Sequence, residues 1–491
     1  MKVHTSKLKY LPAIAAVALF SCKTMEKIEK PNIIIIMADD LGYGDLGCYG
    51  QTKIQTPNID KLAEQGMVFT QFYSGCAVSA PARSSLLTGL HTGHTWIRGN
   101  KTIGDEGDEP LGADVFTLAQ LMKKAGYVTG AFGKWGLGMA DTPGGPNQKG
   151  FDEFFGYLCQ RQAHRYYPQY LWHNDQKYYL KGNDWTEKHT YSADVIHNET
   201  LNFIKANKDK PFFLYVPSII PHAELMAPED KFLEMYKGKF EETPWGVDNS
   251  SGNPYAGNDY GSQDFKIFGY APQPTPRTVF AAMVSRLDAQ VSEIMNMLEE
   301  LGLSENTLIL FTSDNGPHQE GGADPDFFDS NGPLRGYKRD LYEGGIRVPM
   351  IARWPGKIKE GSRSDHMGAF NDIMPTLAEM TGQSLSLPTD GLSFLPALSG
   401  EGNQQIHEYL YWEFHERNGR QAIRKGNWKL IHNHVLTSDY TTALYNLADD
   451  IGETINLADK YPEMVQEMNL LMQNARTPSN IFPFNPHYLK K

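Results

Sequence analysis

The chain has 491 residues, of which 40% are hydrophobic and 21% are charged, and its formal net charge is −12. This length exceeds the usual range of one domain and predicts two. The acidic balance argues against nucleic acid as a partner and against a broadly basic groove for long polyanions. Any anion would therefore bind in a local pocket.

The N-terminus has the pattern of an export signal. Three lysines among the first nine residues precede an apolar run over 10–20 that is too short to span a membrane as a stable helix. Cys22 follows as in a bacterial lipoprotein signal, although Phe20 is bulky for that motif, and a plain secretory signal is the alternative. We expect a signal peptide over 1–22 and a polar tether over 23–30. The mature protein would then be exported to the periplasm or the outer membrane of a Gram-negative bacterium and touch the membrane only through its N-terminal lipid anchor.

Two short apolar runs, residues 32–37 and 307–312, are typical of strands buried on both faces. Each run is followed by oxygen-bearing side chains: Asp39 and Asp40 after the first, Asp314 and Asn315 after the second. Open parallel sheets place ligand sites beyond the carboxyl ends of their strands, so these side chains could meet in one crevice. Three carboxylates and an amide oxygen suit Ca²⁺ or Mg²⁺ better than zinc. Either pair alone is more often an ordinary turn.

Residues 79–83 read Ser-Ala-Pro-Ala-Arg. One interpretation is a turn in which Ser79 caps a helix and Pro81 fixes its start. The pentapeptide also resembles the maturation signature of the sulfatase family, in which a first-position Cys or Ser is oxidised to formylglycine (3-oxoalanine). The resemblance implies that Ser79 becomes the formylglycine through a serine-type sulfatase-maturing enzyme. Cys76 starts no such motif, because no proline follows at its second position.

Between the two acid pairs, strand and helix signals alternate as in a doubly wound sheet. Helices are expected over 58–65 and 114–125, each followed by a glycine. Strands are expected over 127–132 and 212–216. A later helix is marked by apolar residues at helical spacing from 287 to 301, a pattern of core packing.

Three further segments match the same family: Gly-Lys-Trp around Lys134, Pro-His ending at His222, and Leu-Arg-Gly-Tyr-Lys ending at Lys338. The resemblance implies that Arg83 holds the metal-bound formylglycine and that Lys134 and Lys338 bind sulfate oxygens. It also implies that His222 protonates the leaving alcohol. A lone Lys is usually a solvated charge and a lone His is often structural, so this prediction depends on their joint order along the chain.

One position departs from the family pattern. The commonest form, Gly-Lys-Trp-His-Leu-Gly, places a His beside the formylglycine, where it helps the second hydroxyl of the aldehyde hydrate to expel sulfate. This chain has Gly136 there, so the base for that step is open. Either His318, just after the second acid pair, replaces it, or this branch of the family works without it.

The C-terminal part has a different pattern. Residues 421–431 predict a β-hairpin, 444–447 a strand and 462–473 a helix. This resembles the small C-terminal subdomain of sulfatases. The resemblance implies an α/β, alkaline phosphatase-like fold, with a doubly wound mixed sheet flanked by helices in a catalytic domain over 31–385. An α+β subdomain with a short antiparallel sheet would occupy 386–491.

The substrate is predicted from fewer residues. Arg98 and Asn100 closely follow the nucleophile segment, and His164 and Arg165 lie in an Arg- and Tyr-rich stretch that could line the mouth of the site. The alternative is a loop that packs on its own domain. Residues 237–277 read as a long surface loop over the mouth. With the Gly variant, these segments resemble carbohydrate sulfatases, so we expect a sulfated glycan of host or algal origin, with galactose or N-acetylgalactosamine sulfate as the sugar.

Two other functions stay open. The first is a phosphodiesterase or phosphonate monoester hydrolase that uses the same metal pocket with Ser79 unmodified. The second is a non-catalytic lipoprotein that binds sulfated glycan, in which Gly136 marks the decay of a former site. The retention of all the other family residues argues against the second.

Overall fold

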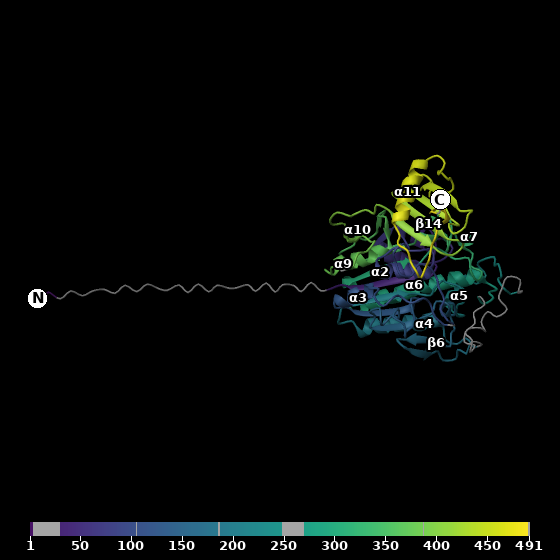
Figure 1. Ribbon diagram of the computed structural model, residues 1–491. Coiled ribbons are helices and arrows are strands. Elements are labelled where there is room, and N and C mark those ends of the chain that lie inside the picture. Colours follow the sequence, from purple (N-terminus) through teal and green to yellow (C-terminus); the bar gives the residue numbers. More distant parts are fainter. Residues whose placement is uncertain (3–29, 105, 185–186, 248–269, 386, 490–491) are drawn as a thin grey trace.

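The computed structural model describes residues 1–2 and 30–489, apart from 105, 185–186, 248–269 and 386 (Figure 1). Its centre is a mixed sheet of ten strands. The strands lie in this order: β11 (Ser362–Ser364), β2 (Met67–Phe69), β10 (Met350–Arg353), β9 (Thr307–Ser313), β1 (Asn32–Ala38), β8 (Phe212–Pro217), β4 (Val128–Lys134), β5 (Glu153–Tyr157), β6 (Tyr170–His173) and β7 (Gln176–Tyr179).

The five central strands, β9, β1, β8, β4 and β5, are parallel. β10 pairs antiparallel with β9, and β6 and β7 form an antiparallel extension beyond β5. All seven residues of β1 are buried, because alternate side chains enter the two apolar layers that cover the sheet. The parallel centre puts the carboxyl ends of these strands at one edge.

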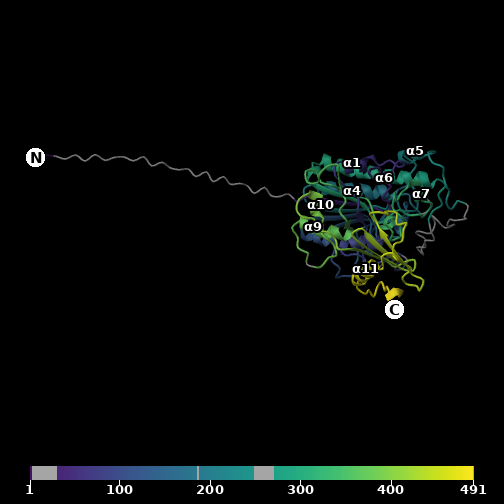
Figure 2. The same cartoon turned by 90° about the horizontal axis from the view of Figure 1, so that it is seen from above.

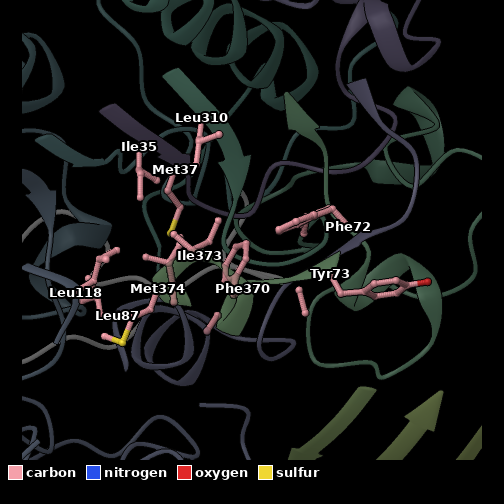
Figure 3. Close-up of a cluster of buried hydrophobic side chains, with 14 of the residues drawn as sticks. Ile35, Met37, Phe72, Tyr73, Leu87, Leu118, Leu310, Phe370, Ile373 and Met374 are labelled. Atoms are coloured by element: carbon pink, nitrogen blue, oxygen red, sulfur yellow. The ribbon is translucent and has the colours of Figure 1, made fainter. Parts of the chain in front are cut away.

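Helices cover both faces of the sheet. One face carries α1 (Pro57–Glu64), α4 (Ser192–Ala206), α5 (Lys231–Tyr236), α6 (Pro276–Glu300) and α7 (Pro325–Phe328), and the other carries α2 (Ser79–Thr88), α3 (Leu118–Lys124), α9 (Ile373–Met380) and α10 (Leu395–Ser399). In the second layer, Ile35 and Met37 of β1 and Leu310 of β9 pack towards Leu87 of α2 and Met374 of α9 (Figure 3). The expected doubly wound, mixed α/β architecture is confirmed.

A second, antiparallel sheet lies at the opposite end of the molecule from β6 (Figure 1), and Figure 2 shows its yellow strands beside α11. It contains β13 (Leu410–Phe414), β14 (Arg420–Lys425), β15 (Trp428–Asn433) and β16 (Thr441–Asn446), and α11 (Pro462–Asn474) packs on it through Met468 and Met472. The remaining elements are β3 (Phe72–Tyr73) paired with β12 (Gly368–Ala369), α8 (Glu343–Ile346) and five 3-10 turns, η1 (Gly47–Tyr49), η2 (Gln162–His164), η3 (Ser304–Asn306), η4 (Phe370–Asp372) and η5 (His487–Leu489).

Buried ion pairs join the C-terminal sheet to the segment around α8. Lys429 Nζ of β15 lies 2.8 Å from Glu343 Oε1 and 3.0 Å from Glu453 Oε1. Glu343 also accepts a hydrogen bond from Tyr73 Oη at 2.6 Å and pairs with Arg347 Nη1 at 3.2 Å. We call these five residues the joining cluster. Of the five, only Lys429 lies in the C-terminal sheet, whereas Glu343 is in α8, Arg347 follows α8, Tyr73 is in β3 and Glu453 follows β16.

The elements match the expectations with two corrections. The helix expected over 114–125 begins only at Leu118, because Thr117 is its N-cap and forms a capping box with Gln120. The loop expected over 237–277 ends earlier, since α6 already begins at Pro276. Most of that loop and of the expected signal peptide falls on residues that the structure does not describe. None of the helices in the described part of the chain has the length and apolarity that a membrane crossing requires.

Candidate active site

The register of β1 against β9 brings the two predicted acid pairs together at the carboxyl edge of the sheet. Asp40 N donates to Asp314 Oδ1 at 3.0 Å, and Asn315 Nδ2 donates to Asp40 Oδ1 at 2.7 Å. With Asp39, these residues form what we call the acid edge, and none of the four is more than 1% exposed. The two pairs therefore meet as predicted, and three carboxylates and one amide lie together at this edge.

Ser79 is the first residue of α2, directly beside the acid edge. The N-cap is Val78, which offers no side-chain hydrogen bond, so the Ser79 hydroxyl does not cap the helix. It donates instead to Asp39 Oδ1 at 3.2 Å and receives a hydrogen bond from Lys134 Nζ at 3.3 Å. Its position agrees with a reactive role and not with the capping alternative.

Arg83 lies one turn after Ser79 on α2 and therefore faces the same edge. Its Nη2 is 2.8 Å from Asp314 Oδ2 and 3.6 Å from Asp39 Oδ1, and its Nη1 donates to the Lys134 carbonyl at 2.9 Å. Burial disfavours the charged guanidinium, but Asp314, Tyr215 and Asp39 outweigh burial and raise the pKa of Arg83. The guanidinium is thus a fixed positive charge.

Two lysines complete the charge balance. Lys134, the last residue of β4, lies 2.8 Å through Nζ from Asp39 Oδ2. Lys338 Nζ lies 2.8 Å from Asp40 Oδ2 and 2.9 Å from Glu320 Oε2. Burial opposes the charge of Lys338, but Asp40 and Glu320 outweigh it and raise its pKa. Each lysine therefore holds a different carboxylate of the acid edge.

His222 lies on the Lys338 side of the site and is 2% exposed. Its Nε2 is 2.8 Å from Lys338 Nζ and 3.3 Å from Asp40 Oδ2, and its Nδ1 contacts the Ala223 carbonyl. Burial, followed by Lys338 and Lys134, lowers the pKa of His222 well below its usual range. These partners assign a neutral ring that carries its proton on Nδ1 and accepts from Lys338.

His164 and His318 lie against this ring and not against Ser79. The ring of His164 stacks on His222 with centroids 4.6 Å apart, and the His318 ring is 5.6 Å away. His318 Nε2 lies 3.1 Å from the Pro221 carbonyl, and its Nδ1 accepts Glu320 N at 3.2 Å. Both nitrogens of His318 are thus bonded to backbone, which does not fit the expected stand-in base. His164 is half-buried and remains a candidate contact for substrate.

Two predicted substrate residues have other partners. Arg98 is 3% exposed, and its Nη1 lies 3.3 Å from Glu413 Oε1 and donates to the Thr477 carbonyl at 2.7 Å. Arg165 is 3% exposed and paired with Glu224. The expectation that these arginines contact substrate is corrected, because both hold the protein together. Asn100, by contrast, is exposed near the start of α2.

Sequence reasoning missed Glu320 and Arg339. Glu320 accepts a hydrogen bond from Lys338 Nζ and pairs with Arg339 Nη1. The network of charges therefore extends beyond Lys338 to Arg339. Burial opposes the ionised form of Glu320, yet Lys338, His222 and Arg339 hold its pKa well below the usual range. Glu320 lies in a loop of mixed composition, and no spacing or motif marks it.

The acid edge fits a divalent cation. Asn315 Oδ1 is buried and, among the described residues, has no hydrogen-bond partner, as expected for an oxygen reserved for a ligand. Oxygens of Asp39 and Asp40 and a ring nitrogen of His222 also lie within 4.8 Å of one another. Carboxylate and amide oxygens are the donors that Ca²⁺ and Mg²⁺ take.

Comparison with known proteins gives a consistent result. Residues 31–383 match the family model Sulfatase, and residues 336–477 match the model N-sulphoglucosamine sulphohydrolase, C-terminal. The chain is 30% identical to the N-acetylgalactosamine-6-O-sulfatase of Bacteroides thetaiotaomicron, in an alignment that covers 97% of this chain and 100% of the relative. The crystal structure of Ps i-CgsB in complex with k-i-k-neocarrahexaose superposes with a TM-score of 0.72 at 29% identity and covers 92% of this chain and 94% of that one. The phosphonate monoester hydrolase of Agrobacterium radiobacter has a TM-score of 0.63 at 19% identity, with 93% and 100% covered, and shows the fold alone.

Proposed function

The chain belongs to the sulfatase family, and on that premise we propose that it cleaves its ester through a formylglycine made from Ser79. It is a sulfuric ester hydrolase that acts on sulfated carbohydrate. The observation that carries the proposal is the position of Ser79. Its hydroxyl does not cap the helix. Its Oγ lies 3.2 Å from Asp39 Oδ1 and 3.3 Å from Lys134 Nζ, next to the carboxylates that fit a cation.

We assign Ca²⁺ to the acid edge, with Mg²⁺ as the alternative. Asp39, Asp40 and Asp314 would supply carboxylate oxygens, and Asn315 would supply the amide oxygen that is free in this structure. When bound, formylglycine supplies a hydrated aldehyde as nucleophile with a second hydroxyl for release of sulfate, and the cation supplies positive charge to the sulfate oxygens.

The residues of the chain then bind and orient the ester. The three carboxylates of the acid edge are balanced by Arg83, Lys134 and Lys338, so a dication makes the pocket net positive and suited to an anionic ester. Lys134 holds residue 79 against the edge by donating to its Oγ, and Arg83 fixes the surroundings by binding Asp314 and the Lys134 carbonyl. Their burial keeps water away, and in such a site fixed donors act more strongly than in water.

The leaving alcohol needs a proton, and the Lys338–His222 pair is the source that we assign. Lys338 Nζ donates to His222 Nε2 at 2.8 Å, so the pair holds one proton in a shared hydrogen bond. Lys338 would give a proton to His222 Nε2, and the ring would pass that proton to the sugar oxygen and leave Lys338 neutral, while Glu320 and Asp40 keep Lys338 in place. The general acid is thus a coupled pair and not an isolated imidazole.

For the sugar, we propose galactose or N-acetylgalactosamine sulfate within a host or algal glycan. The support is the likeness over the full chain to a relative that acts, by its name, on N-acetylgalactosamine-6-O-sulfate. Sulfate release from 6-O-sulfated and 4-O-sulfated N-acetylgalactosamine, measured side by side with glucosamine sulfates, tests this choice. Faster release from a glucosamine sulfate would reject it.

We propose that the enzyme is an exported lipoprotein, anchored through Cys22, and that a serine-type maturing enzyme oxidises Ser79. The N-terminal pattern supports the anchor, and the serine in place of cysteine supports that class of maturing enzyme. Loss of fatty-acid labelling on Cys22→Ala, with labelling retained on Cys48→Ala, would agree with the anchor. Equal labelling of both variants would reject it.

Peptide mass spectrometry tests the central proposal. In protein produced together with a serine-type maturing enzyme, the tryptic peptide that ends at Arg83 should be lighter by about two hydrogens, the change for oxidation of an alcohol to an aldehyde. An unmodified peptide from protein that cleaves phosphate esters would instead favour the phosphohydrolase alternative.

The cation is tested separately. Chelation should lower both activity and the unfolding temperature, and added Ca²⁺ should restore both, because a ligand that binds only the folded state stabilises it by about 2.7 kcal/mol at 100 times its Kd. Recovery with Mg²⁺ but not Ca²⁺ would reverse the assignment.

A further inference from the structure

Two side-chain amides lie beside the start of α2 and have no role in the chemistry above. Asn100 Oδ1 accepts the backbone N–H of Ala80, the residue after Ser79, at 3.4 Å. The same oxygen accepts Gln160 Nε2 at 3.4 Å. Two long hydrogen bonds therefore connect Gln160 through Asn100 to the peptide that follows the nucleophile position.

This arrangement orients both amides. Because Asn100 Oδ1 takes two donors, its Nδ2 is left to face other groups, and Gln160 turns its Oε1 away from Asn100. No donor from the described residues reaches Gln160 Oε1 in this structure. The backbone of Gln160 is also fixed, since its N donates to the buried Asp108 at 2.8 Å. The pair therefore leaves one amide donor and one amide acceptor without a hydrogen bond in the described chain, next to the peptide that follows residue 79.

Gly136 explains why Gln160 can lie there. Residue 136 has a φ of +72°, and a Cβ added to it would lie 2.4 Å from Gln160 Cγ and 2.9 Å from Gln160 Cδ. Gly136 is two residues after Lys134, whose Nζ lies 3.3 Å from Ser79 Oγ. The space that a side chain at 136 would occupy is thus filled by Gln160.

We propose that Gln160 and Asn100 are positioning residues that hold the reactive group of residue 79, with Gln160 in the place left by the small residue at 136. The inference rests on the proposed formylglycine. The Asn100 N–H and the Gln160 carbonyl oxygen match the two hydroxyls of an aldehyde hydrate, one as donor and one as acceptor. Neither amide is a base at neutral pH, so their role is to orient these hydroxyls and to favour the hydrate.

Labelling of the aldehyde with an aminooxy probe tests this without measuring turnover. Holding the hydrate leaves less free aldehyde, so Gln160→Ala and Asn100→Ala should each raise the labelling rate of folded, matured enzyme between about 2-fold and 10-fold, the factor that one hydrogen bond contributes. Gln148→Ala is the control, because Gln148 is exposed and its one side-chain bond goes to the Ala140 carbonyl. Labelling of the same proteins after denaturation measures their aldehyde content.

The outcomes separate the two claims. Equal folded rates for wild type, Gln160→Ala and Asn100→Ala, with equal labelling after denaturation, would overturn the positioning role and leave the formylglycine intact. No labelling of denatured wild type would remove the formylglycine and this inference together.

A second experiment tests the fit between residues 136 and 160. Gly136→Ala should raise the labelling rate as Gln160→Ala does, because the new methyl group displaces Gln160. It should also lower the unfolding temperature more than Gly302→Ala, since Gly302 has a φ of +70° but no atom within 4 Å of an added Cβ. Adding Gln160→Ala to Gly136→Ala should remove that excess. Equal effects of Gly136→Ala and Gly302→Ala would refute the fit.

Discussion

The acid edge and the joining cluster both bury opposite charges, but they differ in which polar atoms remain unused. In the joining cluster, Lys429 is shared by Glu343 and Glu453, and Glu343 is further bound by Tyr73 and Arg347. At the acid edge, one buried amide oxygen has no protein partner in the described chain and one hydroxyl is free of its helix. Glu453 Oε1 also has no hydrogen bond among the described residues, but it lies 3.0 Å from Lys429 Nζ, so its charge is matched within the protein. Asn315 Oδ1 has no such partner in the described chain and can bind a ligand. Variants in the two clusters should therefore separate activity from stability.

The largest effect is expected at the acid edge. Ser79→Ala should lower activity at least about 10⁴-fold, as the loss of other activated nucleophiles does. The unfolding temperature should stay nearly constant, because the hydroxyl caps no helix and Ala is a good helix former. The matched control is Ser85→Ala on the same helix, whose Oγ is buried without a partner in the described chain. Strong destabilisation by Ser79→Ala would contradict the comparison.

The joining cluster should show the opposite pattern. Lys429→Met leaves two buried carboxylates without their ammonium and should lower the free energy of unfolding by about 3–5 kcal/mol. The activity per folded molecule should change little. Lys425→Met is the control, since the Lys425–Glu467 pair is 38% and 47% exposed and solvent screens its charges, so its loss should change stability far less. Urea unfolding followed by activity assays measures both. Similar losses of stability in the two variants would show that burial is not the deciding factor.

Acid should weaken a second group of buried ion pairs, centred on Glu413 of β13. Glu413 lies 2.7 Å from Arg476 Nε and 3.0 Å from His415 Nε2. Burial alone would raise its pKa, but His415 and Arg476 outweigh burial and lower the pKa of Glu413 to about 2. A lowered carboxyl pKa stabilises the fold above the unfolded value near 4.5, here by about 3 kcal/mol, and this is lost as pH falls towards 2.

The difference in unfolding free energy between wild type and Glu413→Gln should therefore be constant from pH 7 to about pH 5 and shrink below it. Urea titrations at pH 6, 4 and 3 measure this difference. A difference that stays the same at pH 3 would contradict the ion-pair account.

The smallest effect is expected where the acid edge meets solvent. Glu320→Gln weakens one of the three contacts that hold Lys338 and should lower kcat about tenfold, the value of one hydrogen bond to a charged group. Glu416→Gln is the control, because Glu416 contacts only the outer side of Arg339, at 3.7 Å. Equal kcat values for the two variants would remove Glu320 from the positioning of Lys338.

Most of the fold and the centre of the site could be predicted from the sequence because buried strands are recognisable as short apolar runs. The apolar runs that form β1 and β9 are followed by Asp39 and Asp314. Parallel pairing of the two strands brings these residues together, regardless of the structure of the segment that connects the strands. One kind of exception is a residue whose partner is far away in sequence. Arg98 is bonded to Thr477, 379 residues later, and no local pattern reveals that contact. Glu320 was missed for a different reason: Lys338 is only 18 residues away, but no motif or spacing marks a glutamate in that loop as its partner.

The order of the elements along the chain also determines when, during synthesis, the site around Ser79 can close. Ser79 is 3% exposed in the finished molecule, but the edge that encloses it closes only when β9 joins β1, and Asp40 and Asp314 are 274 residues apart. At about 5–20 residues per second, roughly 10–50 s of synthesis separate the appearance of residue 79 from that of its last neighbours. The maturing enzyme that we propose would therefore have to reach Ser79 before β9 joins β1, on a chain still being synthesised or still unfolded.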